Sequence, residues 1–184
     1  DKTFKFMIVG RGPITEDLKK QAEDLGIADR VIFAGEVPHD KVAIYYQMGD
    51  VFLNASISET QGLTFIEAMV AETPVNARYD LNLEDLLLKN EAGLVYRTEE
   101  EFINSIMLLK EDKEFREKII ENAFAASQDY TAQKFGERVE EVYKKTIEEY
   151  DSRESFTIFR GEKFLQQIRR WTSLKSSGRS PWSK

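Results

Sequence analysis

Short apolar segments alternate with amphipathic segments along the first half of the chain, and this alternation limits the possible folds more than any other feature. The apolar segments are rich in aromatic and β-branched residues, which favour strands. They lie at 4–9, 31–34, 51–55, 74–77 and 93–96. Segments with helical spacing lie between them, at 15–25, 39–48, 63–71 and 83–88. Strands that alternate with helices predict a parallel sheet with helices on both faces. We therefore expect one Rossmann-like α/β domain.

Three further helices are predicted after the last apolar segment, at 99–109, 112–128 and 132–150. Thr98 and Glu101 stand at the start of the first of them with the spacing of a capping box. Asn82 is expected to cap the earlier helix at 83–88. The second half of the chain is therefore predicted to be helical.

The net charge of −7 is distributed unevenly along the chain. Residues 155–184 carry seven Lys and Arg against one Glu, which leaves −13 for the remaining residues. A polar break at 151–154 lies close to this change. We therefore expect a domain at 1–150 and a basic aromatic tail at 151–184, partly helical or disordered. An acidic body argues against general nucleic-acid binding, which depends on Lys and Arg that neutralise phosphates.

The composition excludes several kinds of site. The 184 residues include no cysteine and one histidine, His39, which we interpret as a surface loop residue. This excludes a disulfide framework, a Cys-ligated zinc or iron–sulfur centre and a multi-histidine metal site. No apolar run approaches the roughly 18 residues of a membrane-spanning helix, and no signal-peptide pattern is present. We therefore expect a cytoplasmic protein.

The segment at 56–69 has the features of a ligand site. It joins the third predicted strand to a helix, and open parallel sheets bind ligands at the carboxyl ends of their strands. Gly62, Leu63 and Thr64 would open this helix, where free N–H groups and the positive end of the helix dipole suit a phosphate. Gly62 would also allow a ligand to approach the backbone closely.

Two carboxylates flank the start of this helix. Glu59 precedes the helix and Glu67 lies within it. Five helical residues rise about 7.5 Å, so the two carboxylates would lie at different levels along the helix axis. Carboxylates accept paired hydrogen bonds from diols, so sugar hydroxyls are suitable partners. If Glu67 is buried among its apolar neighbours, it needs a partner. The alternative is a surface loop in which Ser58 or Thr60 caps the helix and Glu67 is solvated.

These residues resemble the donor-binding signature of retaining glycosyltransferases of family 4. The shared pattern places seven residues between Glu59 and Glu67, includes Gln-Gly-Leu, and ends in Glu-Ala-Met. Further motifs follow the order and spacing of the family, at 9–13, 29–35, 48–53, 73–75 and 92–95. The resemblance covers residue 4 to about residue 150.

The resemblance implies a GT-B fold, in which two Rossmann-like domains face a cleft and the C-terminal domain binds the nucleotide-sugar. Residues 1–150 resemble that C-terminal domain, incomplete at its N-terminus. The resemblance implies that Glu59 is the candidate catalytic residue, in contact with the hexose hydroxyls, and that Glu67 holds the ribose hydroxyls. The other implied nucleotide-sugar-binding residues are Gln61, Gly62, Leu63, Thr64, Val37, Gly10 and Gly12. No metal or other cofactor is implied, and the donor substrate is a UDP-sugar.

Gly10 and Gly12 follow the first predicted strand. A dinucleotide fingerprint would require a third glycine at position 15, where this sequence has Thr15. We therefore interpret the pair as a tight strand-to-helix turn near the ligand. The broken fingerprint argues against a nicotinamide-dependent enzyme.

The sequence departs from the family pattern in places. The strand and loop whose Arg and Lys clamp the diphosphate have no counterpart here, and neither does the N-terminal acceptor domain, so we expect the isolated chain to be inactive. Glu72 stands where the family commonly has glycine, and Asn76 where it has an apolar residue. Asn76 therefore needs a buried partner or exposure to solvent.

Residues 56–64 and 79–84 look most like those of bacterial diacylglycerol glucosyltransferases, which transfer glucose from UDP-glucose to a membrane lipid with retention of configuration. The aromatic and basic tail suits peripheral contact with an anionic inner membrane face, but it equally suits packing on the missing N-terminal domain, or disorder. The expected partners are thus a nucleotide-sugar donor, a lipid or saccharide acceptor and that domain. The alternative function is a non-catalytic module that holds a nucleotide-sugar or a partner protein.

Overall fold

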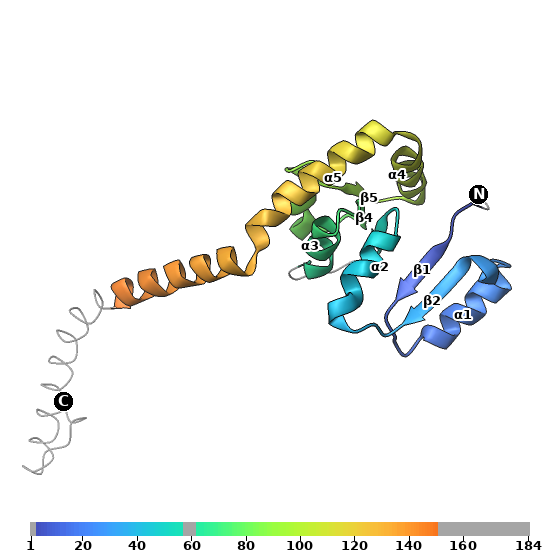
Figure 1. The fold of residues 1–184 in the computed structure, drawn as a ribbon, viewed down its shortest axis with the longest axis horizontal. Helices are drawn as coiled ribbons and strands as arrows, with labels where there is room; N and C mark the ends of the chain where they lie inside the picture. The colour runs from blue at the N-terminus through green and yellow to red at the C-terminus, as the bar shows by residue number, and fades with distance from the viewer. Residues whose placement is uncertain (1–2, 57–61, 151–184) are drawn as a thin grey trace, which may run out of the picture. The chain divides into compact units, whose positions relative to one another are not determined.

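The computed structural model describes residues 3–56 and 62–150, and its strands are all parallel (Figure 1). One sheet pairs β1 (Phe6–Val9) with β2 (Val31–Gly35), and the other has the order β3 (Phe52–Asn54), β4 (Val75–Arg78), β5 (Leu94–Tyr96). β1 begins two residues later than predicted, and the ends of the other four strands lie within one residue of their predicted positions. The parallel α/β class is therefore confirmed. The described strands form two sheets instead of one continuous sheet, because neither β1 nor β2 pairs with β3, β4 or β5.

The helices flank these sheets and also follow the predicted order. They are α1 (Thr15–Asp24), α2 (Val42–Met48), α3 (Leu63–Val70), α4 (Glu99–Glu111), α5 (Lys113–Ser127) and a helix at 132–150. Short 3-10 turns are η1 (Ala28–Arg30), η2 (His39–Lys41), η3 (Leu81–Leu83) and η5 (Gln128–Tyr130), and η4 (Glu84–Leu88) is a π-helical turn. The predicted helix at 39–48 is therefore η2 followed by α2.

Two predicted caps have different outcomes. The capping box is confirmed, because Thr98 Oγ1 accepts from the Glu101 N–H at 3.2 Å and Glu101 Oε2 accepts from the Thr98 N–H at 3.2 Å. The predicted Asn82 cap is wrong. Asp80 has extended backbone angles, and its Oδ1 accepts from the Asn82 N–H at 2.8 Å, so Asp80 caps η3. The carboxylate accepts from the N–H of the second residue after it, which is the sequence spacing of an Asx turn.

The hydrophobic core lies between α3 and the three-stranded sheet. Its fully buried members include Phe65 and Met69 from α3, Val75 and Ala77 from β4, and Leu87 from η4. The mostly apolar sequence of α3 explains why four of its eight residues are buried. This core fixes α3 relative to the end of β3, where the sequence predicts a site.

Asn76 lies at the centre of the three-stranded sheet and is 0% exposed. It is aligned with Leu53 on β3 and Leu94 on β5, and its side chain points away from the face that carries Val75 and Ala77. Among the residues that the structure describes, neither its amide nitrogen nor its amide oxygen has a hydrogen-bond partner. Asn76 is thus buried without a partner, an arrangement that costs free energy.

We expect Asn76→Val to stabilise the fold by about 1–3 kcal/mol, because it removes an unpaired buried amide and adds a β-branched residue to a strand. Denaturant unfolding of the two proteins measures this difference. Asn76→Asp serves as the matched control, because an unpaired buried carboxylate should destabilise the same position. A loss of stability in Asn76→Val would show that the amide has a partner and contradict this explanation.

Glu72 follows α3 with a φ of +58°, in the left-handed region where side chains are strained. The Thr73 N–H donates to Ala68 O at 2.9 Å and the Glu72 N–H donates to Met69 O at 3.2 Å. These two bonds form a Schellman motif, and its left-handed position is normally glycine. The geometry explains why glycine is common at this place in the family that the sequence resembles.

We expect Glu72→Gly to raise the free energy of unfolding by about 0.5–1 kcal/mol, since relief of the backbone strain outweighs the added freedom of the unfolded chain. Glu72→Ala keeps the Cβ atom and removes the carboxylate, so it should give no gain. Thermal or denaturant unfolding of both variants separates backbone strain from charge. Equal stabilisation by alanine and glycine would contradict the strain account.

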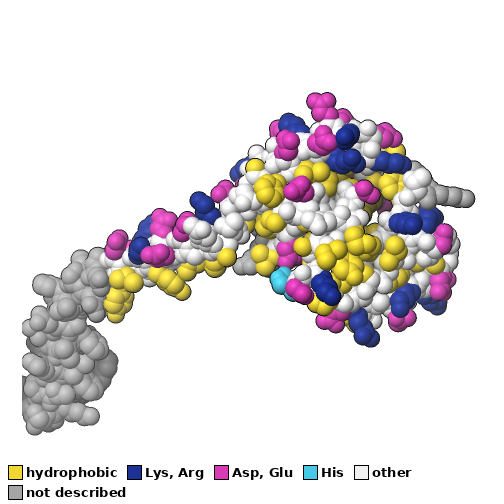
Figure 2. Space-filling view, viewed as in Figure 1, with side chains coloured by type: hydrophobic (Ala, Val, Ile, Leu, Met, Phe, Trp, Pro, Cys, Tyr) yellow, Lys and Arg dark blue, Asp and Glu magenta, His cyan; other side chains and the backbone are white. Residues whose placement is uncertain are grey.

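Residues 1–131 form one compact unit, and the helix at 132–150 belongs to a second unit that begins at Ala132. Figure 2 shows hydrophobic side chains along one face of this helix and charged side chains along another. Its exposed apolar residues are Phe135, Val142, Tyr143, Ile147 and Tyr150. The tail at 151–184 lies outside the described residues, so the domain boundary after residue 150 stays a prediction.

Candidate functional site

The candidate site is built where β3 ends and α3 begins. Asn54 closes β3, and its Oδ1 accepts from the Ser56 N–H at 2.7 Å, which turns the chain after the strand. The connection to α3 includes Glu59 and Gln61, which lie outside the described residues. Their predicted roles therefore stay predictions, as do the alternative caps Ser58 and Thr60.

Gly62 immediately precedes α3 and is buried, with a φ of +62°. A Cβ atom at this position would lie 2.9 Å from Cδ2 of Phe65, which is itself 0% exposed. The carbonyl of Gly62 accepts from the N–H groups of Phe65 and Ile66 at 3.0 and 3.3 Å. The position therefore requires glycine on two grounds, left-handed backbone and close packing.

Leu63 and Thr64 form the exposed first turn of α3. The first N–H groups of a helix have no acceptor within the helix, so they are available to an external anion. This turn has no acidic residue that would offset the positive end of the helix dipole. The structure thus gives the predicted phosphate-binding element an accessible form.

Glu67 lies on α3, half-buried, and its Oε2 accepts a hydrogen bond from the Tyr46 hydroxyl at 3.0 Å. Burial first, and then the hydrogen bond and negative charge of Glu67, raise the pKa of Tyr46 well above its ordinary value. The hydroxyl therefore stays protonated and acts as a donor. Tyr46 is the partner that a buried Glu67 needs.

The sequence alone does not identify Tyr46 as a candidate site residue. Its sequence signal is weak, because a tyrosine within a short predicted helix usually indicates core packing. The structure brings it to Glu67 because α2 and α3 pack together, although 21 residues separate the two side chains.

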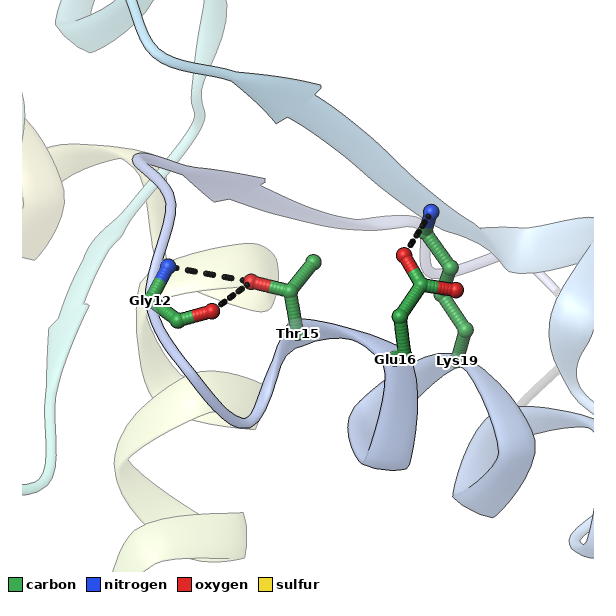
Figure 3. A network of polar contacts seen from close by, with 4 residues as sticks. All are labelled: Gly12, Thr15, Glu16 and Lys19. Carbon is green, nitrogen blue, oxygen red and sulfur yellow. Dashed lines mark hydrogen bonds and ion pairs between the residues drawn. The ribbon is translucent and has the colours of Figure 1, made fainter.

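The turn after β1 contains Gly10 and Gly12 and is closed by Thr15 (Figure 3). The Gly10 N–H donates to Gly35 O at 2.7 Å, and the Gly12 N–H donates to Thr15 Oγ1 at 3.0 Å. The Thr15 hydroxyl in turn donates to Gly12 O at 2.8 Å. The tight strand-to-helix turn is confirmed, and both glycine N–H groups are already bonded.

A ligand could still approach this turn, because a Cβ atom at Gly10 or Gly12 would meet nothing within 4 Å. Val37 is half-buried after β2, and His39 is exposed at the start of η2. The binding roles of Gly10, Gly12 and Val37 stay predictions.

Within the described ranges 3–56 and 62–150, no group of three or more His, Asp or Glu side chains is arranged to hold a metal ion. In the same ranges, no helix has both the length and the apolar character needed to cross a membrane.

The family model of glycosyl transferases group 1 matches residues 1–126. The chain belongs to this glycosyltransferase family. It is 36% identical over 145 residues to an alpha-monoglucosyldiacylglycerol synthase of Streptococcus pneumoniae, which covers 78% of this chain and 32% of that protein. A synthase of the same name from Acholeplasma laidlawii is 30% identical over 144 residues, covering 78% of this chain and 36% of that protein.

Among solved structures, Anabaena HepE (Alr3699) in complex with UDP-glucose superposes on this glycosyltransferase domain with a TM-score of 0.66 and 25% identity, covering 77% of this chain and 41% of that one. This chain spans about a third of the length of each of the two synthases. The resemblance to glycosyltransferases with a GT-B fold, inferred from the motifs, is confirmed.

Proposed function

We propose that this chain is the donor-binding domain of a retaining hexosyltransferase that transfers glucose from UDP-glucose to a membrane lipid such as diacylglycerol. The observation that carries the proposal is the Glu67 carboxylate, held by Tyr46 behind an exposed helix N-terminus at the end of β3. This arrangement offers acceptors for hydroxyl groups and donors for phosphate within one short helix.

Each part of the donor has a suitable counterpart in this proposal. Glu67 accepts hydrogen bonds from the two ribose hydroxyls, and the N–H groups of Leu63 and Thr64 face the diphosphate. Negative charge develops on the diphosphate as it leaves, and fixed N–H donors stabilise that charge. Glu59 would contact the hydroxyls of the hexose. The HepE complex with UDP-glucose supports this choice of donor.

The acceptor is proposed from the relatives. The two synthases named above are, by name, glucosyldiacylglycerol synthases, and they match 78% of this chain. A lipid acceptor places the enzyme at a membrane surface, and the basic aromatic tail at 151–184 would suit peripheral attachment to anionic lipid. The acceptor-binding half would be an N-terminal domain beyond this chain, so residues 1–184 alone should not transfer sugar.

A transfer assay with the whole protein tests the proposal. UDP-glucose, UDP-galactose and GDP-mannose are each offered with diacylglycerol in anionic vesicles. We expect glucosylated lipid from UDP-glucose. NMR of the product should show the α configuration of the donor. Transfer only from GDP-mannose, and not from UDP-glucose, would contradict the proposed donor. A β-linked product would contradict retention of configuration. Transfer only to soluble saccharides would contradict the lipid acceptor.

A further inference from the structure

The Tyr46 side chain is held in place from two directions independently of Glu67. Its ring packs edge-to-face on Phe52, with centroids 5.3 Å apart, and Phe52 packs likewise on Phe65 at 5.9 Å. Its backbone carbonyl accepts from the hydroxyl of the buried Thr73 at 2.8 Å. The chain of rings links α2, β3 and α3, so the Tyr46 hydroxyl has a fixed position relative to α3.

The hydroxyl in this position constrains the Glu67 carboxylate. Tyr46 donates to Oε2, and no other described residue forms a hydrogen bond with the Glu67 side chain. An ionised carboxylate has about four acceptor sites, so one donated bond leaves the remaining sites for a ligand. Without Tyr46, the flexible glutamate would lose rotamer freedom when a ligand binds, and this loss would weaken binding.

We infer that Tyr46 is a positioning residue, which holds the Glu67 carboxylate in the orientation that accepts both hydroxyls of the donor's ribose. The inference rests on the proposed function, because it requires a ribose at Glu67. Tyr46 acts through Glu67 and does not itself touch the donor. Its contribution should therefore depend on the ribose hydroxyls and on an intact Glu67.

A purely structural role is the competing explanation, since Tyr46 also joins α2 to α3. Tyr46→Phe separates the two roles. The variant keeps the ring, its contact with Phe52 and the backbone bond from Thr73, and it loses one hydroxyl group. Tyr45→Phe is the matched control, because Tyr45 is the adjacent tyrosine on α2, is also half-buried, and its hydroxyl forms no hydrogen bond with another described residue.

The test measures the Kd of the whole protein for UDP and for 2′,3′-dideoxy-UDP, which lacks both ribose hydroxyls. We expect Tyr46→Phe to raise the Kd for UDP by about 10-fold, the size of one lost hydrogen bond to a charged group. The Kd for the dideoxy compound should change by less than about 2-fold, and Tyr45→Phe should change neither value. Combined with Glu67→Gln, Tyr46→Phe should weaken UDP binding no further, because the effects of a donor and an acceptor in one hydrogen-bond network are not additive.

Each other outcome is decisive. Equal weakening of both ligands by Tyr46→Phe would assign Tyr46 a structural role and overturn the inference. If the wild-type protein binds UDP and Tyr46→Phe binds it equally well, the inference is overturned and the proposed function stands. Failure of the wild-type protein to bind UDP would overturn the proposed function, and the inference with it.

Discussion

Glu67→Gln is expected to weaken binding of UDP-glucose by about 100-fold, because two hydrogen bonds from ribose hydroxyls to a carboxylate would become weaker bonds to an amide. The amide keeps the shape of Glu67 and can still accept from the Tyr46 hydroxyl, 3.0 Å away in the wild-type protein. The fold should therefore be retained. Calorimetric titration of the whole protein with UDP-glucose measures the effect, and transfer activity should fall in proportion.

Glu72→Ala supplies the control for this result. Glu72 lies just beyond the same helix, is exposed and carries the same charge, so its loss tests whether a general reduction of negative charge affects the donor. We expect unchanged donor affinity in Glu72→Ala. Full donor affinity in Glu67→Gln would contradict the role of Glu67, and equal losses in the two variants would contradict its specificity.

Gly62→Ala is expected to have the second large effect, on stability and binding together. The new Cβ atom would lie 2.9 Å from the buried Phe65 ring, on a backbone with a φ of +62°. Strain and overpacking together should cost about 2–4 kcal/mol of stability. Relief of the clash would shift the first turn of α3, so donor affinity should fall by at least about 10-fold.

Gly26→Ala is a matched control, because it separates backbone strain from the clash. Gly26 has a φ of +65°, similar to that of Gly62, but a Cβ atom there would meet nothing within 4 Å. This variant should lose about 1 kcal/mol of stability and keep its donor affinity. If the two alanine variants lose the same stability and both keep their affinity, close packing at Gly62 is not what shapes the site.

Much of the fold could be predicted from the sequence because its local signals agree with one another. The apolar runs at 31–34 and 93–96 are strands in the structure, and Thr98 and Glu101 form the capping box that their spacing predicts. Asn82 was the exception. Asp80 accepts from the Asn82 N–H, so the helical turn begins at Leu81, two residues before the predicted helix start.

The division of the strands into two sheets could not be read from the sequence. Periodicity indicates which residues form strands, but pairing depends on which strands lie side by side in space. η2 and α2 lie between β2 and β3 in the chain. Among the described strands, neither β1 nor β2 forms ladder hydrogen bonds with β3, so the two sheets stay separate.

The site was predicted unevenly for a similar reason. The motif gave Gly62 and Glu67 directly, since glycine before a helix and a carboxylate one turn into it are local features. The partner of Glu67 was not local, because Tyr46 reaches it only through the packing of α2 on α3. The sequence predicts that Asn76 needs a buried partner or exposure to solvent, and the structure gives it neither among the described residues.

Binding of the donor at the start of α3 is the central claim, and hydrogen–deuterium exchange of the whole protein tests it most directly. UDP-glucose should slow exchange of the Leu63 and Thr64 amides, which lie in the exposed first turn of the helix. The buried Val75 and Ala77 amides on β4 provide an internal reference that should change little. Protection confined to Leu63 and Thr64 is the predicted result. Saturating UDP-glucose that leaves both amides unprotected would contradict it.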